Sequence, residues 1–151
     1  MLTANRISAR GFGKDACFEV TAAGSPVGTI NDTRSTFELD GQSFDITRSG
    51  FLAPQLFLKF GETLIATASQ KPFRNHYTVT AAGKEWTFKA TVLLATTFGL
   101  FENETQTGTV SSGSWTSRLK DITADLPDAL PRPVQMFLLA ILIDILNNPS
   151  N

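Results

Sequence analysis

The chain has 151 residues, the length of a single domain with one hydrophobic core. Apolar residues make up 42% of it and charged residues 18%, a composition that excludes a disordered protein. Thirteen basic and fourteen acidic residues give a net charge of -1. Nucleic-acid binding through bulk electrostatics requires a basic excess, so we expect no nucleic-acid partner.

Cys17 and His76 are the only cysteine and the only histidine. A single cysteine excludes an intrachain disulfide and a Cys cluster for zinc, and a single histidine excludes a site built on several histidines. Residues 1–14 lack the apolar run of a secretory signal, and no stretch reaches the roughly 18 to 20 apolar residues that span a bilayer. We expect a cytoplasmic protein with no transmembrane segment, no cofactor and no metal.

Alternating apolar and polar residues run from Ala16 to about Thr123. Turn residues interrupt this pattern roughly every eight to twelve positions, which is typical of an all-β sandwich or barrel. The pattern predicts a mainly β protein of about ten to twelve strands, with the last three near 92–101, 105–111 and 115–123.

Two hairpins can be placed with their register. Asp40-Gly41 suits a type I′ turn, which needs positive φ at both central residues, and a two-residue loop there sets Phe37 opposite Phe44. A loop at Ala82-Gly83 pairs Val79 with Trp86 and Tyr77 with Phe88 on one face, and Thr80 with Glu85, Thr78 with Thr87 and His76 with Lys89 on the other.

The segment around Gly61-Glu62 predicts a third hairpin of a different kind. Leu56, Phe57, Leu58 and Phe60 precede it, and Leu64, Ile65 and Ala66 follow it. Because apolar residues occupy both alternating positions, we expect this strand pair to be covered on both faces.

After residue 123 the pattern changes. Residues 124–133 contain three prolines and predict a rigid connector, because proline cannot continue a strand ladder. The run VQMFLLAILIDIL then predicts a helix over 134–147 that is apolar on all sides and must be covered on all sides. We expect a closed antiparallel barrel of about 12 strands that encloses this helix, with residues 1–151 forming one domain.

This order of features resembles the tubby C-terminal-like superfamily, which includes the LURP-one-related proteins and the phospholipid scramblases. The resemblance is carried by Phe18, Val20, Gly28 and Ile30, by FELDGQSFDI (37–46) and by MFLLAILIDIL (136–146). It implies a twelve-stranded barrel threaded by the C-terminal helix. Tubby domains bind phosphoinositides through basic side chains, and scramblases bind calcium, but this chain lacks a dense basic patch, an Asp-x-Asp-x-Asp-Gly calcium loop and a cysteine cluster for palmitoylation.

The best candidate site is a small group of basic residues, Lys71, Arg74, His76 and Lys89. Lys71 and Arg74 fall in a loop, and the hairpin register sets Lys89 opposite His76. Arginine presents a planar fork that suits phosphate oxygens, and histidine gains charge as the pH falls. These residues predict a site for an anionic group, whereas the plainer interpretation is a solvated surface.

Other residues are better explained by structure than by chemistry. Asp121, Asp125 and Asp128 could suggest a cation site, but turn and capping roles are a simpler explanation. Asp144 in the helix is expected at the barrel rim, with a buried functional carboxylate as the alternative. Cys17 is expected to be an ordinary strand residue, and Trp86 and Trp115 are expected to fill the core or an interface.

No acid–base or nucleophilic constellation can be placed, so we expect no catalytic residues. The leading hypothesis is a non-enzymatic binding or structural module, whose partner is an anionic phospholipid headgroup or a protein, located at the membrane periphery. The alternative is a lipocalin-like carrier of a small apolar ligand, which needs a cavity of roughly 300 Å³ or more. A hydrolase with a carboxylate pair and a C-terminal membrane anchor are weaker hypotheses, and the sequence leaves the oligomeric state open.

Overall fold

A computed structural model of the chain describes residues 1–7, 17–50, 53–72, 75–91, 97–112 and 121–147. These residues form twelve strands and one helix. The elements are β1 (Leu2–Ile7), β2 (Cys17–Ala22), β3 (Ser25–Asn31), β4 (Thr36–Leu39), β5 (Gln42–Ser49), β6 (Gln55–Phe60), β7 (Thr63–Gln70), β8 (His76–Ala81), β9 (Lys84–Ala90), β10 (Thr97–Glu102), β11 (Thr105–Ser112), β12 (Asp121–Asp125) and α1 (Arg132–Asn147).

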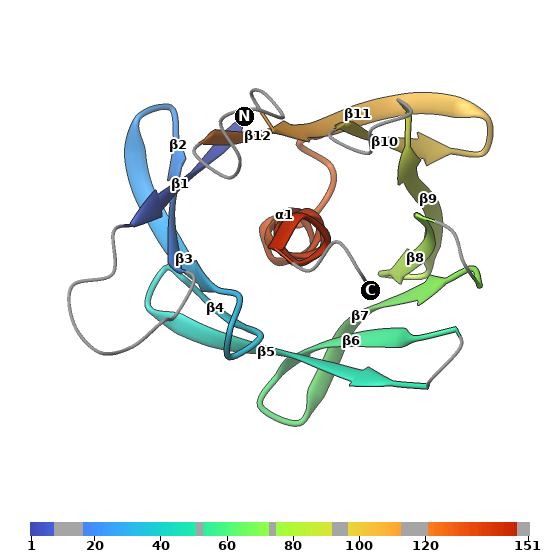
Figure 1. Ribbon diagram of the computed structural model, residues 1–151, viewed down its shortest axis with the longest axis horizontal. Coiled ribbons are helices and arrows are strands. Elements are labelled where there is room, and N and C mark those ends of the chain that lie inside the picture. The colour runs from blue at the N-terminus through green and yellow to red at the C-terminus, as the bar shows by residue number, and fades with distance from the viewer. Residues whose placement is uncertain (8–16, 51–52, 73–74, 92–96, 113–120, 148–151) are drawn as a thin grey trace.

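The strands form a closed antiparallel barrel with α1 in its centre (Figure 1). Each strand pairs with its neighbours in sequence, and β1 closes the ring between β2 and β12. The predicted fold class is therefore confirmed. The first strand begins at Leu2, well before the expected start near Ala16. Residues 8–16, 92–96 and 113–120 lie outside the described part of the chain.

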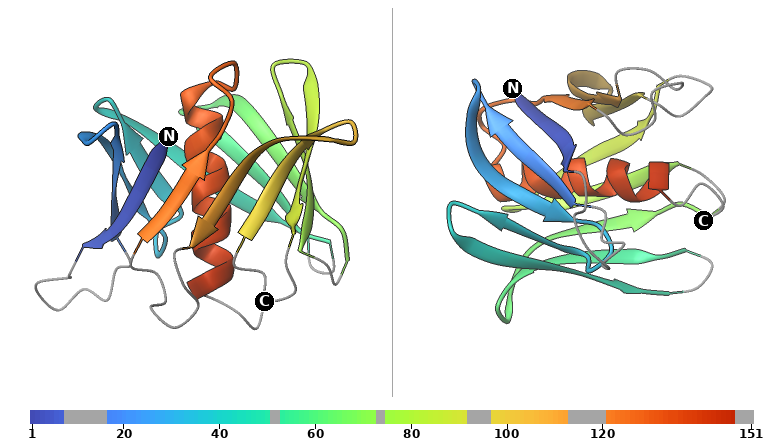
Figure 2. Two further views of the ribbon diagram at one scale, coloured as in Figure 1. Left: turned by 90° about the horizontal axis from the view of Figure 1, so that it is seen from above. Right: turned by 60° about the vertical axis from the view of Figure 1, so that its left-hand side comes forward.

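The barrel has two different ends, which Figure 2 shows from the side. At one end, two-residue turns join consecutive strands at 23–24, 40–41, 61–62, 82–83 and 103–104, and the connector 126–131 leads into α1. We call this the hairpin end. At the other end, which we call the loop end, the odd-numbered strands finish, longer segments join the strands, and α1 terminates.

The hairpin registers follow from the turn residues, as predicted. Asp40 and Gly41 have φ of 52° and 79°, the positive values of a type I′ turn, and Phe37 lies opposite Phe44. Their rings stack with centroids 4.9 Å apart. At the second hairpin the predicted pairs are all observed: Val79 with Trp86, Tyr77 with Phe88, Thr80 with Glu85, Thr78 with Thr87 and His76 with Lys89.

The β6–β7 hairpin is covered on one face only, so the expected double coverage is wrong. Leu58 opposes Ala66, but Lys59 opposes Leu64, which leaves Ile65 as the extra residue of a β-bulge. The bulge shifts the alternation, so that Leu64 points outward with 52% of its surface exposed. Phe60 at the tip is 41% exposed. The apolar run therefore reflects a bulged hairpin tip and not a second covering layer.

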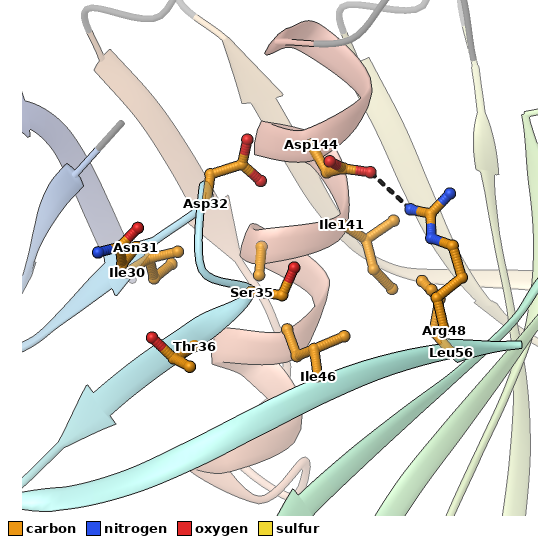
Figure 3. Close-up of a pocket in the computed structure, with 11 residues that line it drawn as sticks. Ile30, Asn31, Asp32, Ser35, Thr36, Ile46, Arg48, Leu56, Ile141 and Asp144 are labelled. Atoms are coloured by element: carbon orange, nitrogen blue, oxygen red, sulfur yellow. Dashed lines mark hydrogen bonds and ion pairs between the residues drawn. The ribbon is translucent and has the colours of Figure 1, made fainter. Parts of the chain in front are cut away.

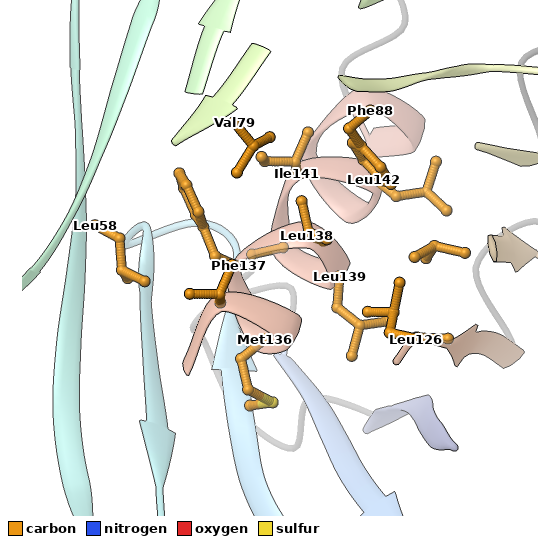
Figure 4. Packing of buried hydrophobic residues seen from close by; sticks show 14 of the residues in the cluster. Leu58, Val79, Phe88, Leu126, Met136, Phe137, Leu138, Leu139, Ile141 and Leu142 are labelled. Carbon is orange, nitrogen blue, oxygen red and sulfur yellow. The ribbon is translucent and has the colours of Figure 1, made fainter. Parts of the chain in front are cut away.

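Helix α1 fills the barrel. Every residue from Val134 to Ile143 is buried, and the inward-facing residues of the strands form one core cluster with them. In Figure 4, Phe137 and Leu139 leave the helix on different sides, so apolar side chains cover the helix around its axis. The helix begins two residues before the predicted Val134. The buried Gln135 donates from Nε2 to the backbone oxygen of Leu130 at 2.8 Å, which ties the helix to the connector.

We predict that a fragment comprising residues 1–130 will not fold. Eight of the ten buried helix residues have large apolar side chains, which contribute on the order of 12–24 kcal/mol of apolar burial, whereas a domain is stable by only about 5–15 kcal/mol. Circular dichroism and thermal melting should show no cooperative transition for the fragment, with the full-length chain as the control. A soluble fragment that melts cooperatively would contradict the prediction.

In the full chain, Phe137→Ala should cost about 3–5 kcal/mol of unfolding free energy.

Candidate functional site

The structure brings three of the four predicted basic residues together near the loop end: Lys71 directly after β7, His76 on β8 and Lys89 on β9. The backbone nitrogen of Lys71 donates to the backbone oxygen of His76 at 2.9 Å, and His76 is the cross-strand partner of Lys89. Because Tyr77 is buried, the alternation of β8 directs His76 to the outer face. Arg74 lies outside the described residues.

Lys89 is held in place by an aromatic ring that the sequence did not indicate. Its Nζ lies 4.7 Å from the centroid of the Phe101 ring, within the range of a cation–π interaction. The ring can lie there because position 99 is glycine: a Cβ on Gly99 would come within 2.7 Å of Phe101 Cε2 and 2.8 Å of Thr91 Cγ2. On the outer face of β9 and β10, the cation–π contact with Phe101 therefore holds the Lys89 ammonium in place.

A cleft opens at the loop end between the last turns of α1 and strands β3 to β6 (Figure 3). Its floor is apolar, and its rim carries Arg48 and Asp144 with polar residues of the turn that follows β3. The lining residues are Ile30, Asn31, Asp32, Ser35, Thr36, Ile46, Arg48, Leu56, Ala140, Ile141 and Asp144. The cleft volume is about 40 Å³, space for a few water-sized groups.

Asp144 lies at the rim of the barrel, where the sequence placed it. Its carboxylate accepts a hydrogen bond from Arg48 Nη2 at 2.7 Å, and the two side chains are 31% and 45% exposed. A carboxylate near a helix C-terminus meets an unfavourable dipole, so the guanidinium offsets a local electrostatic cost. Sequence reasoning missed Arg48, because it lies 96 residues before its partner.

Tyr77 is buried, and both charges of this ion pair act on its phenol. Burial raises the pKa of its phenol to about 12, Arg48 opposes the increase and Asp144 adds to it. The phenol is therefore neutral at physiological pH and responds to the charges of the rim.

The remaining candidates do not form a reactive or metal-binding group in the part of the chain that the structure describes. Asp121 and Asp125 lie at the two ends of β12, and among the described residues no group of three His, Cys, Asp or Glu side chains is placed to hold a metal ion. Cys17 begins β2 and is partly buried. Trp86 is 7% exposed and belongs to the core, whereas Trp115 lies outside the described residues.

Within the described ranges, no helix is both long enough and apolar enough to cross a bilayer. Comparisons of the chain with protein-family models, with curated proteins and with solved structures found no match. A functional assignment therefore depends on the geometry of the barrel surface.

Tyr77 offers a direct test of the rim electrostatics, because it is the only tyrosine in the sequence. Its absorbance in a rapid pH jump should report a pKa of about 12, against about 10 in an unfolded chain. Because the folded pKa is raised, the stability that Tyr77 contributes is fully present below about pH 10 and is lost as the pH rises towards 12.

Variants of the two rim residues should move this titration in opposite directions. Asp144→Asn should lower the pKa of Tyr77, because it removes a negative neighbour, and Arg48→Ala should raise it. Shifts of the same sign in both variants would show that the rim charges do not act on the phenol, and a wild-type midpoint near 10 would show that burial does not raise its pKa.

Proposed function

We propose that the protein is a non-enzymatic binding module that recognises anionic phospholipid headgroups through the outer surface of the barrel near its loop end. The observation that carries the proposal is the juxtaposition of Lys71, which directly follows β7, with His76 on β8 and Lys89 on β9, where the Lys89 ammonium is held over Phe101. A preorganised cation loses less conformational entropy when it binds an anion. The proposal places the protein in the cytoplasm, peripherally at the membrane.

The distribution of charge along the barrel supports this choice of end. Of the eight lysine and arginine residues in the described ranges, five lie in the loop-end half of the barrel: Arg6, Arg34, Arg48, Lys71 and Lys89. The other three lie at the hairpin end among a larger number of carboxylates. An anionic surface would therefore attract the loop end more strongly than the hairpin end.

The filled lumen favours a binding module over the lipocalin-like carrier. Ten consecutive helix residues are buried inside the barrel, and the cleft at the loop end has a volume of about 40 Å³. A pocket for a small-molecule ligand is typically several hundred cubic ångströms.

The closed twelve-stranded barrel around a C-terminal helix also supports the proposed relationship to the tubby C-terminal-like superfamily.

Sedimentation with lipid vesicles tests the proposal. The protein should bind vesicles of phosphatidylcholine and phosphatidylserine but not vesicles of phosphatidylcholine alone. The double variant Lys71→Ala/Lys89→Ala should weaken binding roughly thirtyfold, since each cation near an anionic surface is worth about 1 kcal/mol. Added salt should weaken binding of the wild type.

The matched control is Lys59→Ala/Lys84→Ala, which removes the same charge at the hairpin end. It should bind the anionic vesicles as well as the wild type does. Failure of the wild type to bind, or equal losses in the two double variants, would refute recognition by the loop-end group.

A further inference from the structure

The hairpin end is strongly acidic. Within two residues of the five turns, and at the connector, lie eight carboxylates (Glu38, Asp40, Glu62, Glu85, Glu102, Glu104, Asp125 and Asp128) and three cations (Lys59, Lys84 and Arg132). All of these acidic residues except Glu102 are exposed. Glu102 pairs with Lys84 at 3.5 Å, and it is the only one of the eight in an ion pair in the described structure.

The tip of the β6–β7 hairpin places two large apolar side chains in this acidic surface. Phe60 is 41% exposed and Leu64 is 52% exposed. Phe60 opposes Thr63 and Leu64 opposes Lys59, so the bulge sets the two on opposite faces of the tip. The Phe60 ring contacts Phe44 with centroids 5.2 Å apart, whereas Leu64 lies outside the core cluster.

The position of this tip makes it accessible to a partner. In Figure 1 the turn between β6 and β7 projects outward from the ring of strands. Glu62 lies in the turn itself, the neighbouring β4–β5 turn contains Asp40, and the β8–β9 turn on the other side is followed by Lys84 and then Glu85. The exposed side chains of Phe60 and Leu64 are therefore bordered by carboxylates on three adjacent hairpins.

These charges select the chemistry of the partner. An anionic bilayer would be repelled by the carboxylates, so lipid insertion of the tip is disfavoured. A partner with apolar side chains beside lysine or arginine would cover Phe60 and Leu64 and would meet the carboxylates with complementary charge. A basic amphipathic segment of a protein has both properties.

We propose that the hairpin end is a docking site for a basic amphipathic segment of a partner protein. Leu64 and Phe60 contact the apolar side chains of the segment, and Glu62 with the neighbouring carboxylates contacts its lysine and arginine side chains. This site is at the opposite end of the barrel from the anionic-lipid site. It does not depend on that site, and a protein bound to a membrane by its loop end would present it to the cytoplasm.

A synthetic peptide with lysine and leucine at amphipathic helical spacing is the probe, and fluorescence anisotropy measures its binding. Leu64→Ser should weaken binding about tenfold, the loss expected for one buried aliphatic anchor. Glu62→Lys should weaken it by a similar factor, and added salt should weaken it further. Peptides with serine in place of leucine, or with glutamate in place of lysine, should bind far more weakly.

Ile7→Ser is the matched control, because Ile7 is 41% exposed and ends β1 at the loop end. It should leave the affinity for the peptide unchanged. Thermal melting verifies that each variant is folded, and Leu64→Ser is preferred to a Phe60 variant because Phe60 contacts the core.

The proposal is overturned if Leu64→Ser binds the peptide like the wild type, if Ile7→Ser loses as much affinity, or if the glutamate peptide binds equally well. Self-association of the wild type that disappears in Leu64→Ser would assign the tip to a second copy of the chain instead. Leu64-dependent binding to neutral vesicles would assign it to a membrane. Loss of anionic-vesicle binding alone would refute only the proposed function and not this site.

Discussion

Helix α1 has no polar side that could face water, and the fold is organised around covering it. The residues from Val134 to Ile143 are buried in every direction, so a single sheet packed on one side would leave half of the helix exposed. A closed barrel covers the whole circumference and also removes the unpaired sheet edges that promote aggregation. Closure requires β1, which joins β2 to β12, so the first residues of the chain complete the wall around one of its last segments.

The same helix determines where chemistry can occur. Because it occupies the lumen, apolar side chains of the described strands and of the helix pack together in the barrel interior, and Arg48 and Asp144 lie where the helix emerges at the loop end. Asp144 lies there with its carboxylate near the negative end of the helix dipole, and Arg48 compensates it from β5. Tyr77, which is buried, has a raised pKa because the rim is also where the apolar core begins. The cleft therefore lies where the last turns of α1 emerge from the apolar core at the loop end.

Local signals were sufficient to predict most of the wall and the central helix. Asp40-Gly41 and Ala82-Gly83 fixed two registers, because a two-residue turn with positive φ permits one pairing only. Features that depend on residues distant in sequence were not predictable. Arg48 is 96 residues from Asp144, and the support of Lys89 by Phe101 depends on space left by Gly99. The β6–β7 bulge was missed because the period of the apolar residues does not reveal an extra residue in one strand.

The net charge of -1 conceals a separation of charge that only the topology reveals. In an antiparallel meander every second turn lies at the same end, so residues near alternate turns are close in space although they are far apart in sequence. Glu38, Glu62 and Glu104 lie in or beside three different turns and share the hairpin end, whereas Lys71 and Lys89 lie towards the loop end. The average composition is nearly neutral, yet the described part of the chain has an acidic end and an end with more of the cations. Such a molecule takes a preferred orientation beside any charged surface or partner, even where no single residue makes a strong contact.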